Sequence, residues 1–190
     1  MKLEDGKGTG TLAEVDGDQR LQVASISSDR AESANFDKES FVLSTNKFSI
    51  GAGVEYRVAY ISNGEASRDM VIDLERFYTD GGSTSNTKPI TFRCYVNASV
   101  PTTNSVAKDP IGTNTSAGQS SADFVVWDGV STGMVQVSAG DKMGDGIITI
   151  GNTDARLPSK LILGPAKTMT YSFECAEAAE VSLQIYIHLV

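Results

Sequence analysis

MTYSFECAEAAEVSLQIYIHLV, residues 169–190, is the stretch that decides the fold of this chain. Apolar side chains occupy the odd positions of Met169–Cys175, and polar side chains occupy the even positions between them. After a short connection at residues 177–180, the odd positions of Val181–Leu189 are apolar again. Because successive side chains of a strand point to opposite faces, each half is predicted to be a strand with one face toward a core. We expect the two strands to form a β-hairpin within an all-β fold.

Segments of the same kind recur along the rest of the chain, separated by turn residues. Residues 41–43 and 47–50 are expected to pair tightly around Thr45-Asn46, and Ser62-Asn63-Gly64 is expected to end the strand before it. A weak helical pattern at residues 67–77 fits a strand better. Strands this short and this frequent predict a single antiparallel β-sandwich. The expected strands are Leu21–Ile26, Phe41–Leu43, Lys47–Ile50, Val54–Tyr60, Met70–Tyr78, Ile90–Val96, Phe124–Trp127, Met134–Val137, Ile147–Ile150 and Leu161–Leu163.

The shared phase of the alternation also predicts which side chains form the core. Both cysteines, Cys94 and Cys175, are in phase with apolar neighbours, so we expect buried thiols. A disulfide between them requires that their strands are neighbours or face each other. The predicted core residues are Phe92, Cys94, Val96, Tyr171, Phe173, Leu183, Ile185 and Ile187.

Composition disfavours several classes of partner. The 190 residues include 16 Lys and Arg against 24 Asp and Glu, which gives a net charge of −8. An acidic surface repels phosphate backbones and anionic lipids, so we expect neither nucleic acid nor a membrane as a partner. The N-terminal residues lack the apolar run of a signal peptide, and no 18-residue apolar run occurs, so we expect synthesis in a cytoplasm without export by that route.

Two polar segments are expected to lie outside the core. Residues 1–20 are rich in glycine and charge, and they predict an extended N-terminal arm before a sandwich domain at residues 21–190. Such an arm is either a frayed terminus or a segment that a neighbouring molecule orders. Residues 97–122 are mostly Ser, Thr, Asn, Gly and Ala with two prolines. We expect them to be a functional excursion or a mobile loop.

The search for an active site begins with the single histidine, His188, which is predicted on the polar face of the last strand beside Tyr186. A lone imidazole without a second His or a nearby Cys does not make an ordinary zinc site. A Ser-His-Asp triad would need His188, and no serine has the context of a nucleophile elbow. We therefore expect His188 to be solvated or in a subunit contact. No catalytic, metal-binding or cofactor-binding residues are assigned.

Acidic residues offer two further candidates. Asp73 and Glu75 are predicted to share a strand face with Val71 and Phe77, and a glycosidase needs only such a carboxylate pair. A charged outer strand face explains the pair better. The stretch AGDKMGDG, residues 139–146, fails the spacing of a calcium loop and fits an acidic β-turn. A phosphate-binding glycine motif is absent from the sequence, and Trp127 is expected in core or interface packing.

Three segments together resemble the small structural proteins of tailed-bacteriophage virions, in particular head decoration and cement proteins. They are DGKGTGTLAEVDGDQRLQVASIS at residues 5–27, FVLSTNKFSI at residues 41–50 and LPSKLILGPAKTMTYSFE at residues 157–174. The resemblance implies a jelly-roll-like sandwich with no catalytic residues. It also implies a homotrimer that binds the major capsid protein on the outer surface of the virion.

These observations lead to one expected function and two alternatives. We expect a non-enzymatic decoration or cement protein that stabilises the phage head, made in the host cytoplasm, with subunit contacts through residues 97–122 and the face of Tyr186, His188 and Val190. The first alternative is a carbohydrate- or receptor-binding domain of a tail or fibre. It requires exposed aromatics such as Tyr78, Tyr95 and Trp127 on one concave surface. The second is a glycan-degrading enzyme, which requires the Asp73 and Glu75 pair in a cleft.

Overall fold

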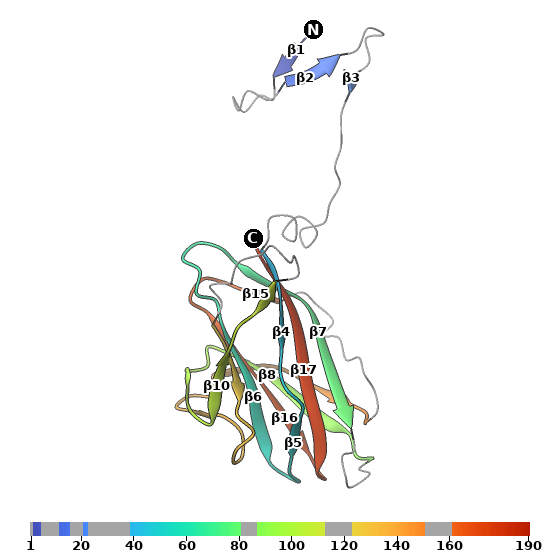
Figure 1. The fold of residues 1–190 in the computed structure, drawn as a ribbon, viewed down its shortest axis with the longest axis vertical. Coiled ribbons are helices and arrows are strands. Elements are labelled where there is room, and N and C mark those ends of the chain that lie inside the picture. Colours follow the sequence, from blue (N-terminus) through green and yellow to red (C-terminus); the bar gives the residue numbers. More distant parts are fainter. Residues whose placement is uncertain are drawn as a thin grey trace.

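Two antiparallel sheets face each other in the computed structural model (Figure 1), which describes residues 2–4, 12–15, 21–22, 39–80, 87–112, 123–150 and 161–190. These residues form seventeen strands and no helix. The all-β class and the antiparallel sheets predicted from the alternation are therefore confirmed. The segment at residues 67–77 lies mostly within a strand, as expected.

The first sheet, called the β16 sheet, has six strands with β16 near its centre. Their order is β10 (Ser105–Lys108), β12 (Asp123–Trp127), β6 (Glu55–Ser62), β16 (Thr168–Cys175), β8 (Ile90–Val96) and β14 (Asp141–Ile148). The second, called the β17 sheet, has the order β11 (Ile111–Gly112), β4 (Ser40–Ser44), β17 (Ala179–Leu189), β7 (Met70–Asp80) and β15 (Leu161–Leu163), and β5 (Phe48–Ile50) also pairs with β17.

The strand order is that of a jelly roll. Among the eight principal strands, numbered along the chain as β4, β6, β7, β8, β14, β15, β16 and β17, one sheet holds the first, eighth, third and sixth in that order. The other sheet holds the second, seventh, fourth and fifth. Two antiparallel Greek keys folded over a common core give this arrangement.

The final strand pair is not a hairpin, which corrects the expectation for residues 169–190. Strand β16 pairs with β6 and β8, whereas β17 pairs with β4, β5 and β7 in the opposite sheet (Figure 1). The connection between them therefore crosses from one sheet to the other. Alternation sets which face of each strand meets the core, but it does not select the hydrogen-bonding partner, so two strands that face each other across a core have the same pattern as a hairpin.

Strands β4 and β5 also do not pair with each other, contrary to expectation. Both pair with the same edge of β17, β4 along residues 184–188 and β5 along residues 179–181. Between them the amide of Leu183 donates to Thr45 Oγ1 at 2.9 Å, and the amide of Thr45 donates to the Leu183 carbonyl at 2.9 Å. The Thr45-Asn46 segment is thus a break along one edge rather than a turn between two strands.

Two other expectations for polar segments are corrected. Within residues 97–122 the structure describes β9 (Pro101–Thr103), β10 and β11, so this part is not a structureless loop; residues 113–122 lie outside the described part. The acidic stretch around Asp141 and Asp145 is strand β14, which pairs with β8 and has a bulge at Met143, rather than a β-turn. Glycine and aspartate are uncommon within strands, which explains why the pattern resembled a turn.

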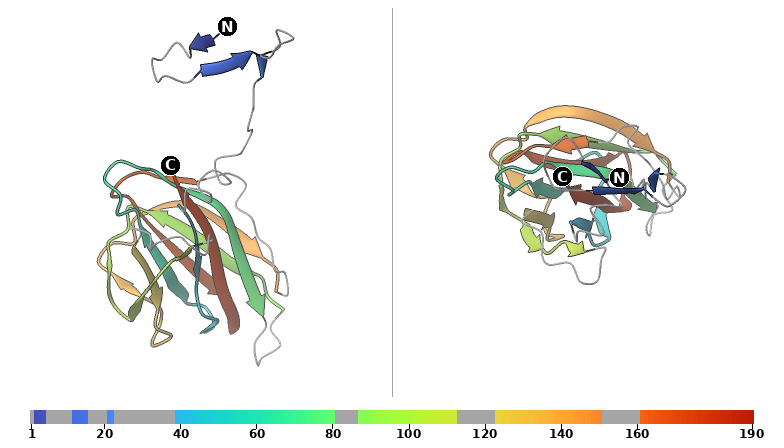
Figure 2. Two further views of the ribbon diagram at one scale, coloured as in Figure 1. Left: turned by 45° about the horizontal axis from the view of Figure 1, so that its top comes forward. Right: turned by 90° about the horizontal axis from the view of Figure 1, so that it is seen from above.

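A two-stranded ribbon of β9 and β13 (Val135–Gln136), called the outer ribbon, covers the outer face of the β16 sheet. The Gln136 Nε2 amide donates to Thr170 Oγ1 at 2.9 Å, and Thr168 Oγ1 donates to the Ala98 carbonyl at 2.7 Å. Thr170 is buried on this outer face for that reason. Figure 2 shows the sandwich from two further directions.

Near the N-terminus, β1 (Lys2–Glu4), β2 (Leu12–Val15) and β3 (Leu21–Gln22) form a small antiparallel sheet of their own. The expected strand at Leu21–Ile26 is described only at its first two residues. The boundary expected between residues 20 and 21 stays a prediction, because residues 23–38 lie outside the described part.

The core lies between the two sheets and contains the residues that the alternation predicted, all of them buried except Val96, which is half-buried. The Phe77 ring stacks on Phe92 with centroids 4.6 Å apart and meets the edge of Phe173 at 5.7 Å. Trp127 is buried against Phe48, which confirms its packing role. Cys94 and Cys175 are both buried, as expected, and no disulfide joins them.

Candidate functional site

A bulge in β7 separates the two carboxylates that were expected to share a face. Opposite β17, the pairing passes from Leu74 to Ile72, so Asp73 has no partner position. Ile72 packs in the core on one side of the bulge, and Phe77 packs there on the other. The extra residue therefore reverses the phase of the strand, with Glu75 facing inward and Asp73 outward. The carboxylate pair that the glycan-degrading alternative requires is therefore not assembled from Asp73 and Glu75.

Glu75 is buried within the core at 2% exposure, in contrast to the charged outer face that was expected. The hydroxyl of Tyr171 donates a hydrogen bond to Glu75 Oε1, and Oε2 has no hydrogen-bond partner among the described residues. Desolvation raises the pKa of Glu75 to about 7, and the hydrogen bond from Tyr171 opposes that rise. The carboxyl group is therefore about half protonated near neutral pH.

The groups around Glu75 are also held in their neutral forms. Cys94 lies opposite Tyr171 in the β8–β16 pairing, and burial followed by the nearby Glu75 raises the pKa of its thiol. Burial, and then the same carboxylate, raises the pKa of the Tyr171 phenol. A thiolate nucleophile requires a lowered pKa and solvent access. This cluster has neither property, so it contributes to packing rather than to nucleophilic chemistry.

His188 is buried at 1% exposure, which corrects its expected place on a solvated or interface surface. Its Nδ1 contacts Asp73 Oδ2, which the β7 bulge turns to the same outer face of the β17 sheet. The expected role of this residue in a subunit contact is therefore not compatible with its burial. Alternation predicted the correct face, but it could not reveal that this part of the face is covered.

The register also places Ser40 opposite His188, so serine, histidine and aspartate lie in that order across β4, β17 and β7. A catalytic triad would need a hydrogen bond between the serine and His188 Nε2. Nε2 has no hydrogen-bond partner within the described part of the chain, and the Ser40 and His188 side chains are both buried. The three residues therefore have the order of a catalytic triad across the sheet, but they lack the serine–histidine hydrogen bond and the access to substrate that catalysis requires.

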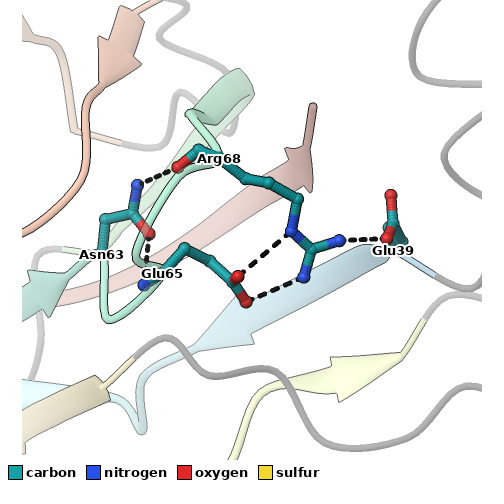
Figure 3. Close-up of polar contacts among 4 residues, drawn as sticks. All are labelled: Glu39, Asn63, Glu65 and Arg68. Atoms are coloured by element: carbon teal, nitrogen blue, oxygen red, sulfur yellow. Dashed lines mark hydrogen bonds and ion pairs between the residues drawn. The ribbon is translucent and has the colours of Figure 1, made fainter.

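One end of the sandwich is held by a polar network that the sequence did not reveal (Figure 3). Fully buried Asn63 donates from Nδ2 to the carbonyls of Arg68 at 2.9 Å and Leu163 at 2.8 Å, and it accepts from the Glu65 amide at 3.0 Å. Arg68 forms a two-pronged ion pair with Glu65 and a further contact with Glu39, which precedes β4. Asn63 was predicted only as a turn residue, because its partner Leu163 is 100 positions away.

The aromatic residues named for a carbohydrate surface do not gather. Tyr78 is partly exposed on the outer face of the β17 sheet, Tyr95 is on the outer face of the β16 sheet, and Trp127 is in the core. The Tyr95 hydroxyl donates to Glu55 Oε1 at 2.8 Å. These three residues therefore do not form the concave aromatic surface that the carbohydrate-binding alternative requires.

Aliphatic side chains are exposed at several places in the described part of the chain instead. On the outer ribbon the usual pattern is reversed, because Gln136 is buried against the sheet while Val135 and Val137 on either side are 48% and 86% exposed. The edge strands also expose aliphatic residues, Ile147 on β14 and Ile162 on β15. Exposed apolar side chains that gather into one surface mark an interaction site more often than an isolated exposed valine does.

Searches for a metal site, for a membrane-spanning helix and for related proteins assign no further function. Among the described residues, no three His, Cys, Asp or Glu side chains gather in a way that could hold a metal ion. The same residues contain no helix of the length and apolarity needed to cross a membrane. No family model and no curated protein matches the sequence.

Proposed function

We propose that this protein is a non-enzymatic structural protein of a phage virion, which binds the major capsid protein on the outer surface of the capsid and stabilises the head. The jelly-roll strand order supports the proposal, since viral capsid domains use this architecture, although lectins do too. The resemblance of residues 5–27, 41–50 and 157–174 to decoration proteins points the same way. A bridging protein adds interface area that must be broken before the shell opens.

The observation that carries the proposal is the reversed outer ribbon. A ribbon that buries the polar Gln136 and exposes Val135 and Val137 has an apolar outer surface with no role in the packing of its own sandwich. Covering this surface with a capsid subunit would stabilise the complex through apolar burial. The head-binding surface is therefore assigned to the outer ribbon.

Sedimentation with empty expanded heads of the phage that encodes the protein tests this role. The unaltered protein should pellet with heads in a saturable, stoichiometric manner. Val137→Asp should weaken that binding, because it places a charge in the apolar contact, whereas Tyr78→Ser on the opposite sheet should bind normally. Failure of the unaltered protein to bind heads at micromolar concentration contradicts the proposal.

We also propose a homotrimer whose contacts use the lateral edges of the sandwich. Phe77 on β7 contacts Phe92 on β8, and Phe48 on β5 contacts Trp127 on β12. The strand orders of the two sheets, as given above, therefore lie over each other in the same sense. Strands β14 and β15 consequently share one lateral edge, and β10 and β11 share the other. The first edge exposes Ile147 and Ile162, and the second exposes Val106 and Ile111.

Contact between unlike edges of neighbouring copies is heterologous, and such a contact gives a closed trimer when the rotation between copies closes after three subunits. Light scattering should therefore give a trimer mass at micromolar concentration, and Ile147→Asp should shift it toward the monomer. A stable monomer mass for the unaltered protein contradicts the trimer. Deleting residues 2–20 should leave the melting temperature of the sandwich nearly unchanged and weaken assembly, because a short polar arm buries little apolar area.

A further inference from the structure

A cavity of about 260 Å³ lies on the outer face of the β16 sheet, beside the outer ribbon. Its floor is formed by Glu55 and Arg57 of β6, and its wall is formed by residues 132–136. Both parts of the lining are in the described part of the chain. The volume is below that of the usual drug-sized pocket and suits a ligand of about one sugar ring.

The wall of the cavity is held firmly against β6. Gly133 has a φ of 95°, and a Cβ at this position would lie 2.7 Å from the Arg57 amide nitrogen. The next amide, Met134, donates to the Arg57 carbonyl at 3.0 Å, and Asn104 Nδ2 donates to the Gly133 carbonyl at 3.3 Å. Only glycine allows this close approach, so the cavity is formed by the fold before any ligand arrives.

Arg57 supplies the cavity with hydrogen-bond donors that the protein does not use. Its guanidinium takes part in no hydrogen bond or ion pair with the residues that the structure describes, and it carries five N–H donors. The neighbouring Arg93 differs, because it contacts Glu174 at 2.7 Å and Glu55 at 3.5 Å. The guanidinium of Arg57 is thus available to an incoming anion, and a planar carboxylate matches its geometry.

Glu55 restricts which anion can enter. Its Oε1 accepts hydrogen bonds from Tyr95 and Ser172. Among the residues that the structure describes, Oε2 has only the longer contact with Arg93, so it retains capacity to accept. A ligand that consists of a carboxylate alone would lie close to the Glu55 carboxylate when bound to Arg57, and the two negative charges would repel each other. A ligand that also carries hydroxyl groups can donate to Glu55 while its own carboxylate binds Arg57.

We propose that this cavity binds a sugar acid, with the ligand carboxylate on Arg57 and a ring hydroxyl on Glu55. The exposed hydroxyl of Thr132 and the side chain of Val135 complete the lining with one polar and one apolar contact. A neutral sugar lacks the anion that Arg57 favours, and a simple carboxylate lacks the hydroxyls that Glu55 favours. The cavity shares Val135 with the proposed head-binding surface, but a titration of the isolated protein tests the sugar-acid site without a capsid.

Nuclear magnetic resonance titration of the full chain tests the site with four probes: glucuronate, N-acetylneuraminate, glucose and acetate. At least one of the two sugar acids should give saturable shifts of the amides of residues 133–136, and glucose and acetate should bind more weakly. Arg57→Gln should reduce the affinity for that sugar acid by roughly tenfold or more, since a charge-assisted pair is lost. Arg76→Gln is the matched control, because Arg76 lies over the Tyr186 ring on the opposite sheet.

A second variant separates loss of the site from loss of the fold. Gly133→Ala should displace the wall and abolish the shifts while Arg57 remains, and the dispersion of the spectrum reports whether the sandwich stays folded. The proposal is overturned if neither sugar acid gives saturable shifts at residues 133–136. It is equally overturned if Arg57→Gln binds as tightly as the unaltered protein, or if glucose or acetate binds as well as the sugar acids.

Discussion

The Tyr171 hydroxyl donates a hydrogen bond to Glu75 Oε1 across the core, and this bond joins the two sheets of the sandwich. Tyr171 belongs to β16 in one sheet, and Glu75 belongs to β7 in the other. A buried carboxyl group at such a position makes folding depend on pH, since its protonated form is favoured in the folded chain and its charged form in water.

The first prediction concerns the stability of the protein between pH 5 and pH 8. The pKa of Glu75 is about 7 in the folded chain against an ordinary value of 4.5, so the folded chain binds more protons in this window. The stability from this group is fully present below pH 4.5 and is lost as the pH rises through about 7, by about 3 kcal/mol. Glu75→Gln should flatten the dependence in chemical denaturation, whereas exposed Asp109→Asn should not. An unchanged slope in Glu75→Gln would contradict the assignment.

A second prediction isolates the Tyr171 hydroxyl. Tyr171→Phe keeps the ring but removes the donor to Glu75, and leaving a buried acceptor without a partner costs about 1–3 kcal/mol. The Tyr171 bond lowers the pKa of Glu75, so its removal should move the midpoint of the pH dependence upward. Denaturation of Tyr171→Phe across pH measures both effects. A midpoint that stays or moves downward would argue against this hydrogen bond.

The third prediction tests the phase of β17. Ile185 is fully buried in the core, and truncation to alanine should destabilise the protein by about 2–5 kcal/mol. The control is Val130→Ala in the turn after β12, where the exposed side chain should change the stability by less than about 0.5 kcal/mol. Equal effects of the two substitutions on the free energy of unfolding, measured by urea denaturation, would contradict the assignment of Ile185 to the core face of β17.

The fourth prediction compares two members of the network in Figure 3. Asn63→Ala leaves two carbonyls and one amide without their partner in a buried site, so we expect a loss of roughly 2–5 kcal/mol. Arg68→Ala removes ion pairs of a side chain that is 36% exposed, so the loss should stay below about 1 kcal/mol. Melting curves of the two variants give the ranking, and a larger effect at Arg68 would contradict it.

Alternation of apolar and polar residues determined most of the strands and the inward faces of β8, β16 and β17. That information is local, because side chains on a strand point to opposite faces whatever the strand pairs with. Core residues such as Phe173 and Leu183 could therefore be predicted without knowing the topology. For the same reason the acidic, glycine-containing sequence of β14 was predicted as a turn, since its strand conformation depends on pairing with β8.

Only the tertiary structure decided which strands are neighbours and which faces are covered. The partners of β16 and β17 lie far away in the chain, so the pattern of residues 169–190 could not distinguish a hairpin from two strands in opposite sheets. One extra residue at Asp73 reverses the phase of β7, which buries Glu75 and brings Asp73 to His188. The loop at Gly133 meets Arg57 across about 75 positions of sequence, and the cavity exists only because long-range packing brings these two segments into contact.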